Sequence, residues 1–178
     1  MIIFMGVAGA GKSMQGRMLA DEQGLPWLST GEFLRMLISG DKRKQMLSGK
    51  LLGDEEIIAL VQKIFTVVDT EHEFVLDGFP RSVGQADWLL NQVKYGQLDI
   101  TAIVHITATE EVVRERLINR GRPDDQHDVI AERFSEYKNI TLPVLKAFRD
   151  ANISVYDIDG DQTPQEVHDD IEKAIFKK

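Results

Sequence analysis

A glycine-rich run near the N-terminus carries the most specific chemistry in the sequence. Residues 6–13 read Gly-Val-Ala-Gly-Ala-Gly-Lys-Ser and match the pattern G-x-x-x-x-G-K-[ST] in full. Glycines let successive backbone N–H groups turn toward one phosphate, and a helix that begins at the lysine adds the positive end of its dipole. Lys12 can then hold the outer phosphates of a nucleotide, and Ser13 can approach a magnesium ion. The run predicts a nucleotide-phosphate site rather than a plain turn between strand and helix.

A carboxylate follows a short apolar run farther along the chain. Residues 74–81 read Phe-Val-Leu-Asp-Gly-Phe-Pro-Arg, so that Asp77 ends a predicted buried strand. Ligands bind at this edge of an open parallel sheet, and an acidic side chain there can order the water around a magnesium ion. An aspartate before glycine is also a common start of a turn. The complete phosphate-loop motif in the same chain favours the magnesium role.

Arginines gather around one loop in the C-terminal half of the chain. They are Arg116, Arg120, Arg122 and Arg133. Arg116 and Arg120 are one helical turn apart and share a face, and the loop between Arg120 and Arg133 holds the glycine and proline expected of a mobile segment. A single surface arginine usually serves only solubility. Several around one loop suit phosphoryl transfer, in which guanidinium groups raise the rate by roughly 10³–10⁵.

Composition narrows the possible classes of protein. The 178 residues predict one domain, residues 1–178. A net charge of −8 argues against a general binder of nucleic acids or anionic membranes, because such binding needs a basic face. With no cysteine, the chain has no disulfides and no cysteine-based zinc site, and its four histidines are scattered. No stretch approaches the ~18 apolar residues of a membrane span, so we expect a cytoplasmic protein.

Short apolar runs alternate with helical periodicity along the whole chain. The predicted strands are residues 2–5, 74–76, 100–106 and 153–158, with 25–29 a weaker candidate because of Pro26. The predicted helices are residues 12–23, 31–39, 54–68, 83–92, 110–120, 128–140, 143–150 and 164–176. This alternation predicts an α/β fold with a parallel sheet covered on both faces.

Local signals support the starts of three helices. Ser29 with Glu32, Ser82 with Gln85, and Thr163 with Glu166 each have the spacing of a capping box. Pro143 interrupts a long helical pattern and should split or kink that helix.

Taken in order, these motifs resemble the adenylate kinases of the nucleoside monophosphate kinase family, over nearly the whole chain. The most specific match is Asp-Gly-Phe-Pro-Arg-Ser at 77–82 with Gln85. Residues 28–35 and 48–52 resemble the segments that hold the monophosphate, and residues 120–125 with Arg133 resemble the arginines of the family's lid. The resemblance implies a phosphate-loop fold of three α/β/α layers with a five-stranded parallel sheet. It also implies a helical monophosphate-binding flap (the flap segment, about 30–60) and a very short lid loop (about 120–126).

The resemblance also implies a role for each matched residue. The ATP site would comprise Gly9, Ala10, Gly11, Lys12, Ser13, Met14, Arg116, Arg120 and backbone near Gln162. The AMP site would comprise Thr30, Arg35, Lys50, Leu51, Leu52, Gly78, Phe79, Pro80, Arg81, Gln85, Arg122 and Arg133, with Gln85 reading the adenine. The catalytic groups would be Lys12, Arg81, Arg120, Arg122 and Arg133. Asp77, through bound water, and Ser13 would serve the metal.

The implied activity is reversible, magnesium-dependent transfer of the ATP γ-phosphoryl group to AMP, giving two ADP. No general base is needed, because the attacking phosphate oxygen is already anionic. We expect a monomer whose ligands are ATP, AMP and ADP, with Mg²⁺ and without zinc, because the lid is too short for the zinc-binding form. We also expect no nucleic-acid or membrane partner.

The chain departs from the family pattern at the phosphate loop. Ala8 stands where proline is usual, and Ser13 and Met14 stand where glycine and threonine are usual. Three alternatives therefore remain at this point. They are a UMP/CMP-type kinase, a weakly active nucleotide-sensing module, and a phosphate-loop kinase for another metabolite. Asp77–Ser82 followed by Gln85 favours a nucleotide acceptor, and the retained arginines favour catalysis over sensing.

Overall fold

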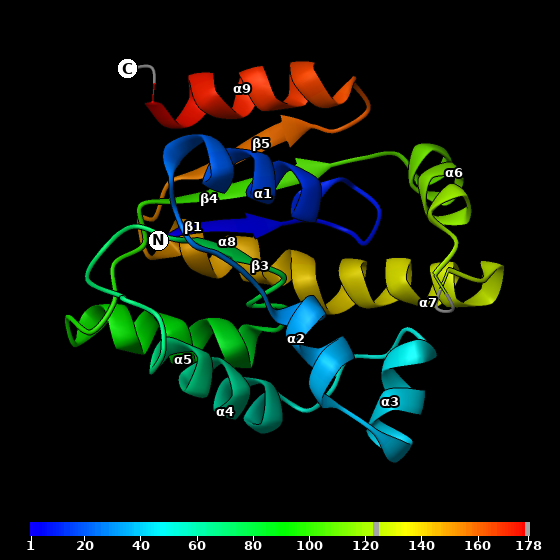
Figure 1. Cartoon of the computed structure of the whole chain (residues 1–178), viewed down its shortest axis with the longest axis horizontal. Helices are drawn as coiled ribbons and strands as arrows, with labels where there is room; N and C mark the ends of the chain where they lie inside the picture. The colour runs from blue at the N-terminus through cyan, green and yellow to red at the C-terminus, as the bar shows by residue number, and fades with distance from the viewer. Residues whose placement is uncertain (123–124, 177–178) are drawn as a thin grey trace.

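The computed structural model describes residues 1–122 and 125–176, so Pro123 and Asp124 of the lid loop lie outside the described residues. A parallel sheet with strand order β2-β3-β1-β4-β5 forms its centre (Figure 1). The strands are β1 (Ile2–Met5), β2 (Trp27–Ser29), β3 (Val75–Asp77), β4 (Ala102–Thr107) and β5 (Val155–Asp159). The predicted five-stranded parallel sheet is confirmed, including the weak candidate that became the edge strand β2.

Alternate residues of β1 enter the two cores on either side of the sheet. Ile3 and Met5 belong to the core that α4, α5 and α8 cover, whereas Ile2 and Phe4 belong to the core beneath α1, α6 and α9. All of β1 is buried. A strand buried on both faces reads as a continuous apolar run, which is why its sequence was recognisable.

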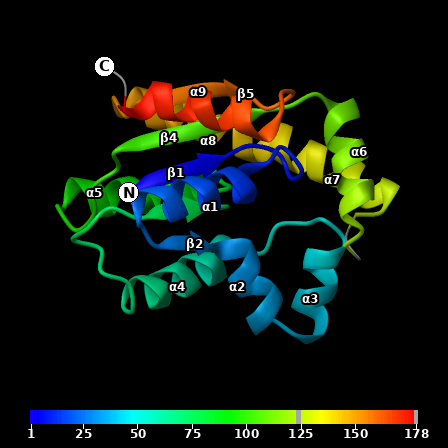
Figure 2. The same ribbon diagram turned by 45° about the horizontal axis from the view of Figure 1, so that its top comes forward.

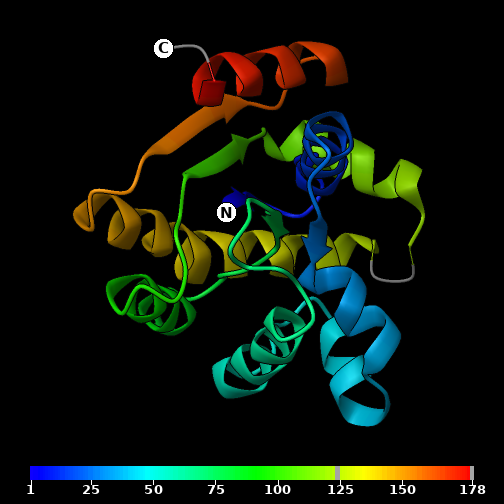
Figure 3. The ribbon, with the colours of Figure 1, turned by 60° about the vertical axis from the view of Figure 1, so that its left-hand side comes forward.

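Helices cover both faces and confirm the three-layer arrangement. They are α1 (Lys12–Gln23), α2 (Thr30–Leu37), α3 (Gly40–Leu47), α4 (Asp54–Phe65), α5 (Val83–Lys94), α6 (Glu110–Arg120), α7 (His127–Glu136), α8 (Leu142–Asp150) and α9 (Pro164–Phe176). Helices α2 and α3 project beyond the sheet at one corner of the molecule in all three views (Figures 1, 2 and 3). Among the described residues, no helix is long and apolar enough to cross a membrane.

Helix α3 was not predicted. Its sequence, Gly-Asp-Lys-Arg-Lys-Gln-Met-Leu, has no buried residue in the structure. Without a buried face, the helix leaves no repeating apolar spacing in the sequence, so periodicity could not reveal it.

Pro143 interrupts its helix as predicted. A π-helical turn at Tyr137–Thr141 separates α7 from α8, and Pro143 occupies the first turn of α8. The proline lacks the N–H that an α-helical ladder would need there. The wider turn that results places Tyr137 and Thr141 in the wall of the cavity described below.

One of the three predicted capping boxes is confirmed in full, because Thr163 and Glu166 cap each other reciprocally. At Ser82 only half of the box forms: Ser82 Oγ accepts the Gln85 N–H, but the Gln85 side chain accepts from the Arg81 N–H instead of the Ser82 N–H. The box at Ser29 is wrong, because the Ser29 side chain makes no cap hydrogen bond to α2. Its Oγ donates to the carboxylate of Asp77 at 3.1 Å.

Phe148 of α8 tests how far packing of the helices on the sheet sustains the fold. Its side chain is fully buried in the core shared with α4 and α5. We expect Phe148→Ala to lower the free energy of unfolding by about 3–5 kcal/mol, measured by urea denaturation, because it leaves a cavity. Tyr95→Ala, at a side chain 72% exposed, should change it by less than about 0.5 kcal/mol. Equal effects at the two positions would contradict this account.

Candidate active site

A cavity of about 510 Å³ opens at the carboxyl edge of the sheet, between the β1–α1 loop, the flap segment and the lid region. Ligands bind to open α/β sheets at this edge, at the point where the order of the strands reverses. The following predicted site residues line it: Gly9, Gly11, Lys12, Ser13, Met14, Arg35, Lys50, Leu51, Asp77, Gly78, Pro80, Arg81, Arg116, Arg120, Arg122 and Arg133. Residues far apart in the sequence therefore meet in one space.

The phosphate loop is held tightly between β1 and α6. Gly9 has a φ of +91°, and a Cβ there would lie 2.8 Å from Leu117 Cγ, so that only glycine fits. Lys12 begins α1 and donates from Nζ to the Val7 carbonyl at 2.8 Å. The lysine thus closes the loop around the end of its own helix, where a phosphate would meet backbone N–H groups.

Burial changes the proton affinity of Lys12. Desolvation lowers its pKa from 10.5 to about 8, and Arg81, Arg120 and Arg133 act in the same direction. Asp77 opposes this shift because its negative charge favours the ammonium. Lys12 therefore loses its charge at a lower pH than a solvated lysine does.

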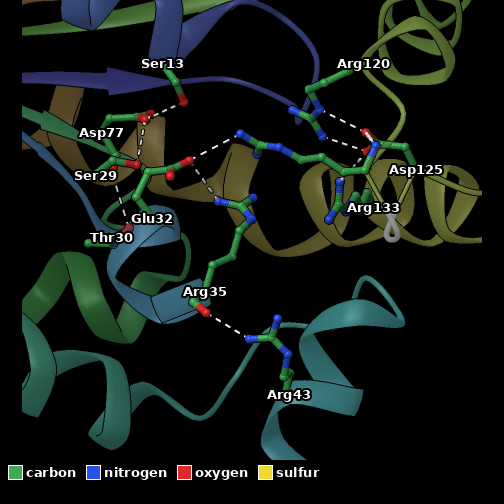
Figure 4. Close-up of polar contacts among 11 residues, drawn as sticks. Ser13, Ser29, Thr30, Glu32, Arg35, Arg43, Asp77, Arg120, Asp125 and Arg133 are labelled. Carbon is green, nitrogen blue, oxygen red and sulfur yellow. Dashed lines mark hydrogen bonds and ion pairs between the residues drawn. The ribbon is translucent and has the colours of Figure 1, made fainter. Parts of the chain in front are cut away.

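Asp77 collects hydroxyl groups at the end of β3. Its Oδ2 accepts from Ser13 Oγ at 2.6 Å and from Ser29 Oγ at 3.1 Å (Figure 4). Magnesium prefers oxygen ligands and keeps several waters, so a carboxylate beside the phosphate-loop serine fits such an ion. Thr30 lies just behind and donates to the carbonyl groups of Asp77 and Gly78.

The arginines of the cavity are balanced by Asp125 and Glu32, two acids that the sequence analysis did not place in the site. Asp125, whose side chain is 1% exposed, accepts from Arg120 Nε at 2.9 Å and Nη2 at 2.6 Å, and from Arg133 Nη1 at 3.4 Å. Burial and the nearby arginines lower the pKa of Arg133 to about 10. A phosphate entering here would compete with Asp125 for the same guanidinium groups.

Glu32 connects the flap segment to the lid region. Its Oε1 lies 3.3 Å from Nη1 of Arg35, on α2, and 3.2 Å from Nη2 of Arg122, two residues beyond the end of α6. Figure 4 shows the contact with Arg35. The Arg35 carbonyl in turn accepts from Arg43 of α3 at 2.8 Å. Glu32 had been assigned to a capping box, whereas the structure gives it to these two arginines.

The remaining predicted residues lie outside this cavity. Ala10 and Gln162 line a smaller pocket of about 150 Å³, in which Arg116 Nη2 donates to the Gln162 carbonyl at 3.3 Å. Thr30, Leu52, Phe79 and Gln85 are buried behind the cavity wall. The side-chain amide of Gln85 bonds to the Arg81 N–H and to Asp54.

Tyr137 is a further cavity residue that sequence reasoning missed. Its hydroxyl lies 2.5 Å from His105 Nε2, and His105 Nδ1 lies 2.6 Å from Asp157 Oδ1. Burial lowers the pKa of His105 and raises that of Tyr137 to about 12. The neutral imidazole fixes the phenol on the π-helical turn. A tyrosine in a helical stretch gave no signal of this contact, because its partners lie on β4 and β5.

One group of potential metal ligands lies away from the cavity. Its members, Glu22, His168 and Glu172, stand close together. His168 Nε2 lies 2.7 Å from Glu22 Oε2, and its Nδ1 lies 3.3 Å from Gln15 Oε1. These contacts join α1 to α9, and we assign them to packing.

Comparison with known proteins decides the family. The family model described as adenylate kinase matches residues 4–153, which include every residue of the larger cavity. The chain belongs to the adenylate kinase family. Gln162, in the smaller pocket, lies beyond the matched span.

Curated adenylate kinases are similar over most of this chain. Adenylate kinase 1 of Nostoc sp. is 33% identical over 180 residues, covering 98% of this chain and 97% of the relative. The adenylate kinase of Mycobacterium tuberculosis is 38% identical over 155 residues, covering 84% and 86%. That of Archaeoglobus fulgidus is 30% identical over 214 residues, covering 99% and 98%. The aligned region spans most of the length of each of these relatives.

The lowered pKa of Lys12 predicts a pH dependence of phosphate binding by this protein. Above pH 8 the free protein loses the ammonium charge, so binding must restore the proton. We expect the affinity for inorganic tripolyphosphate to fall by up to about tenfold per pH unit between pH 8 and 9.5. Calorimetric titration of Lys12→Arg should show no comparable loss, because its guanidinium keeps the charge. Parallel profiles for the two proteins would contradict the assignment.

Proposed function

We propose that this chain transfers the γ-phosphoryl group of ATP reversibly to AMP, giving two ADP, and that the cavity residues named above do so. Membership of the adenylate kinase family and the names of the relatives support the reaction. The observation that carries it is the pairing, in one cavity, of a phosphate loop with a second set of cations on the flap side. Two phosphorylated ligands can therefore meet in one space.

On the phosphate-loop side, the backbone of Gly9–Met14 and Lys12 would hold the phosphates of ATP. Arg116 and Arg120 would lie along the same nucleotide, and the small pocket beside Gln162 suits its base. Met14 lines the cavity with its side chain 48% exposed. It lacks the hydroxyl usual in the family, but its backbone N–H remains available to a phosphate.

On the flap side, Arg35 and Arg81 would hold the phosphate of AMP. Arg81 Nε donates to the Gly78 carbonyl at 2.8 Å, which fixes the conformation of the arginine side chain. Burial lowers the pKa of its guanidinium group. Gln85 and Thr30 lie next to Arg81 and Gly78, buried behind the cavity wall. They would read the base once a shift of the flap segment exposes them, with the backbone of Lys50–Leu52 facing the base. These roles follow from position within the family motif.

Asp77, through bound water, and Ser13 would hold a magnesium ion beside the phosphates. The ion would neutralise charge on the β- and γ-phosphates while the group moves. The chain's own contribution is positioning and charge. The arginines align the two nucleotides in line and stabilise the charge that spreads over the moving group.

When nucleotides bind, the arginines would exchange their contacts with Asp125 and Glu32 for contacts with phosphate. Arg120 and Arg133 would leave Asp125 for phosphate oxygens, and Arg35 and Arg122 would leave Glu32 in the same way. We infer that the flap segment and the lid loop close over the nucleotides, which would exclude the water that otherwise hydrolyses ATP. The contact of Glu32 with Arg122 already joins the two segments.

The alternatives carry less support. The family and the named relatives favour AMP over the acceptors of UMP/CMP-type kinases. A pure sensor would have no use for the several arginines that crowd the site of transfer. We further propose a cytoplasmic monomer without a nucleic-acid partner, a view that the net charge of −8 supports.

The direct test is ADP formation from ATP and a panel of monophosphates. We expect AMP to be preferred over GMP and UMP in kcat/KM, with activity dependent on Mg²⁺. Lys12→Ala should retain less than about a tenth of the wild-type turnover, because it removes charge at the phosphates and no packing. Equal kcat/KM for AMP and UMP would instead support a UMP/CMP-type kinase.

Arg133→Ala tests the role of the lid arginines. We expect kcat to fall by roughly 10³-fold with little change in the KM for ATP, because the guanidinium acts on the transition state. Arg114→Ala on α6 is a matched control, since Arg114 forms an exposed ion pair with Glu110, and should change kcat by less than about twofold. An unchanged kcat in Arg133→Ala would remove that residue from the catalytic groups.

A further inference from the structure

The side-chain amide of Gln85 has a fixed orientation. Gln85 is 2% exposed in the first turn of α5. Its Oε1 accepts from the Arg81 backbone N–H at 2.8 Å, and its Nε2 donates to Asp54 Oδ1 at 2.9 Å. Turning the amide by half a rotation would set its oxygen against the carboxylate and its NH₂ against an N–H. Both contacts would then be repulsive, so the amide is held one way round.

Asp54 is itself firmly placed. It begins α4 within the flap segment, and its Oδ1 also accepts from Ser82 Oγ at 2.7 Å. Because Ser82 donates its only hydroxyl proton there, its oxygen is free to accept the Gln85 N–H. Gly84 makes room for the carboxylate, since a Cβ at that position would lie 2.5 Å from Asp54 Oδ2.

We propose that Asp54 determines which base the monophosphate site accepts, by fixing the orientation of Gln85. The inference rests on the proposed function, in which Gln85 reads the base. Held this way, the amide keeps one N–H and one oxygen lone pair for a ligand. These match a ring acceptor beside an exocyclic amino donor, as in adenine. A 6-oxopurine presents a ring N–H beside a carbonyl and would need the amide reversed. Asp54 contacts Gln85 and not the ligand, so it is a positioning residue.

Inosine monophosphate is the sharpest probe, because it differs from AMP at those two positions alone. In Asp54→Asn, the new carboxamide can turn its NH₂ toward Gln85, which removes the charged acceptor that favours the present orientation of the amide. The Arg81 N–H still opposes reversal, but the preference for the present orientation becomes weaker. We expect the ratio of kcat/KM for AMP to that for inosine monophosphate to fall by about tenfold or more. Glu55→Gln, at an exposed acid in the same helical turn, should keep the wild-type ratio within about twofold.

Gly84→Ala provides a second variant that retains every charge. Its methyl group displaces the Asp54 carboxylate, and alanine favours the helix, so the fold should survive. The ratio should fall here as well. Circular dichroism and thermal unfolding will show that both variants are folded.

The outcomes separate the inference from the function on which it depends. If Gln85→Leu loses the AMP preference but Asp54→Asn and Gly84→Ala keep it, the role of Asp54 is overturned and the proposed function stands. An equal loss of activity toward both monophosphates would reduce Asp54 to a structural residue and also overturn the inference. If the wild-type protein forms no ADP from ATP and AMP, the proposed function fails, and the inference with it.

Discussion

The burial of several cations around one cavity is the constraint on which the rest of this structure depends. Lys12, Arg35, Arg81 and Arg133 all have lowered pKa values, in each case with burial as the first cause. Charges of one sign brought together out of water destabilise the folded state unless other interactions hold them. The sheet supplies that restraint, because strands buried on both faces place the phosphate loop and Asp77 at one edge.

Three acids compensate the positive charge of these side chains, and each makes a different kind of contact. Asp77 opposes the lowering of the Lys12 pKa and engages two hydroxyl groups. Asp125 is buried and holds Arg120 in a two-point contact, which fixes the plane of the guanidinium. Glu32 is more exposed and bridges Arg35 on α2 and Arg122 beyond α6. The acids keep the arginines ordered and leave them in positions where phosphate oxygens can replace a carboxylate.

The sequence predicted those features whose causes are local. The phosphate loop, β1 and α1 follow from a contiguous motif, and the Ser82 and Thr163 caps from spacings of three residues. Helix α3 was not predicted because none of its residues is buried, so its sequence has no apolar periodicity. Ser29 and Glu32 were misassigned because their partners, Asp77 and Arg122, are remote in the chain. Short spacings cannot reveal a competitor that only the tertiary structure brings near.

Arg81 shows why the base and phosphate parts of the site cannot be separated. Its side chain faces the cavity, its backbone N–H holds the Gln85 amide, and its carbonyl accepts from Thr141 Oγ1 at 2.9 Å. Thr141 ends the π-helical turn that begins at Tyr137, one helical turn after Arg133. One residue therefore joins the proposed phosphate contact, the amide proposed to read the base, and the helix that carries Arg133. A shift of Arg81 toward a phosphate would also move Gln85 and Thr141, because the backbone groups of Arg81 are hydrogen-bonded to both residues. Through these hydrogen bonds, the position of a phosphate bound by Arg81 would influence the position of the Gln85 amide, which is proposed to recognise the base.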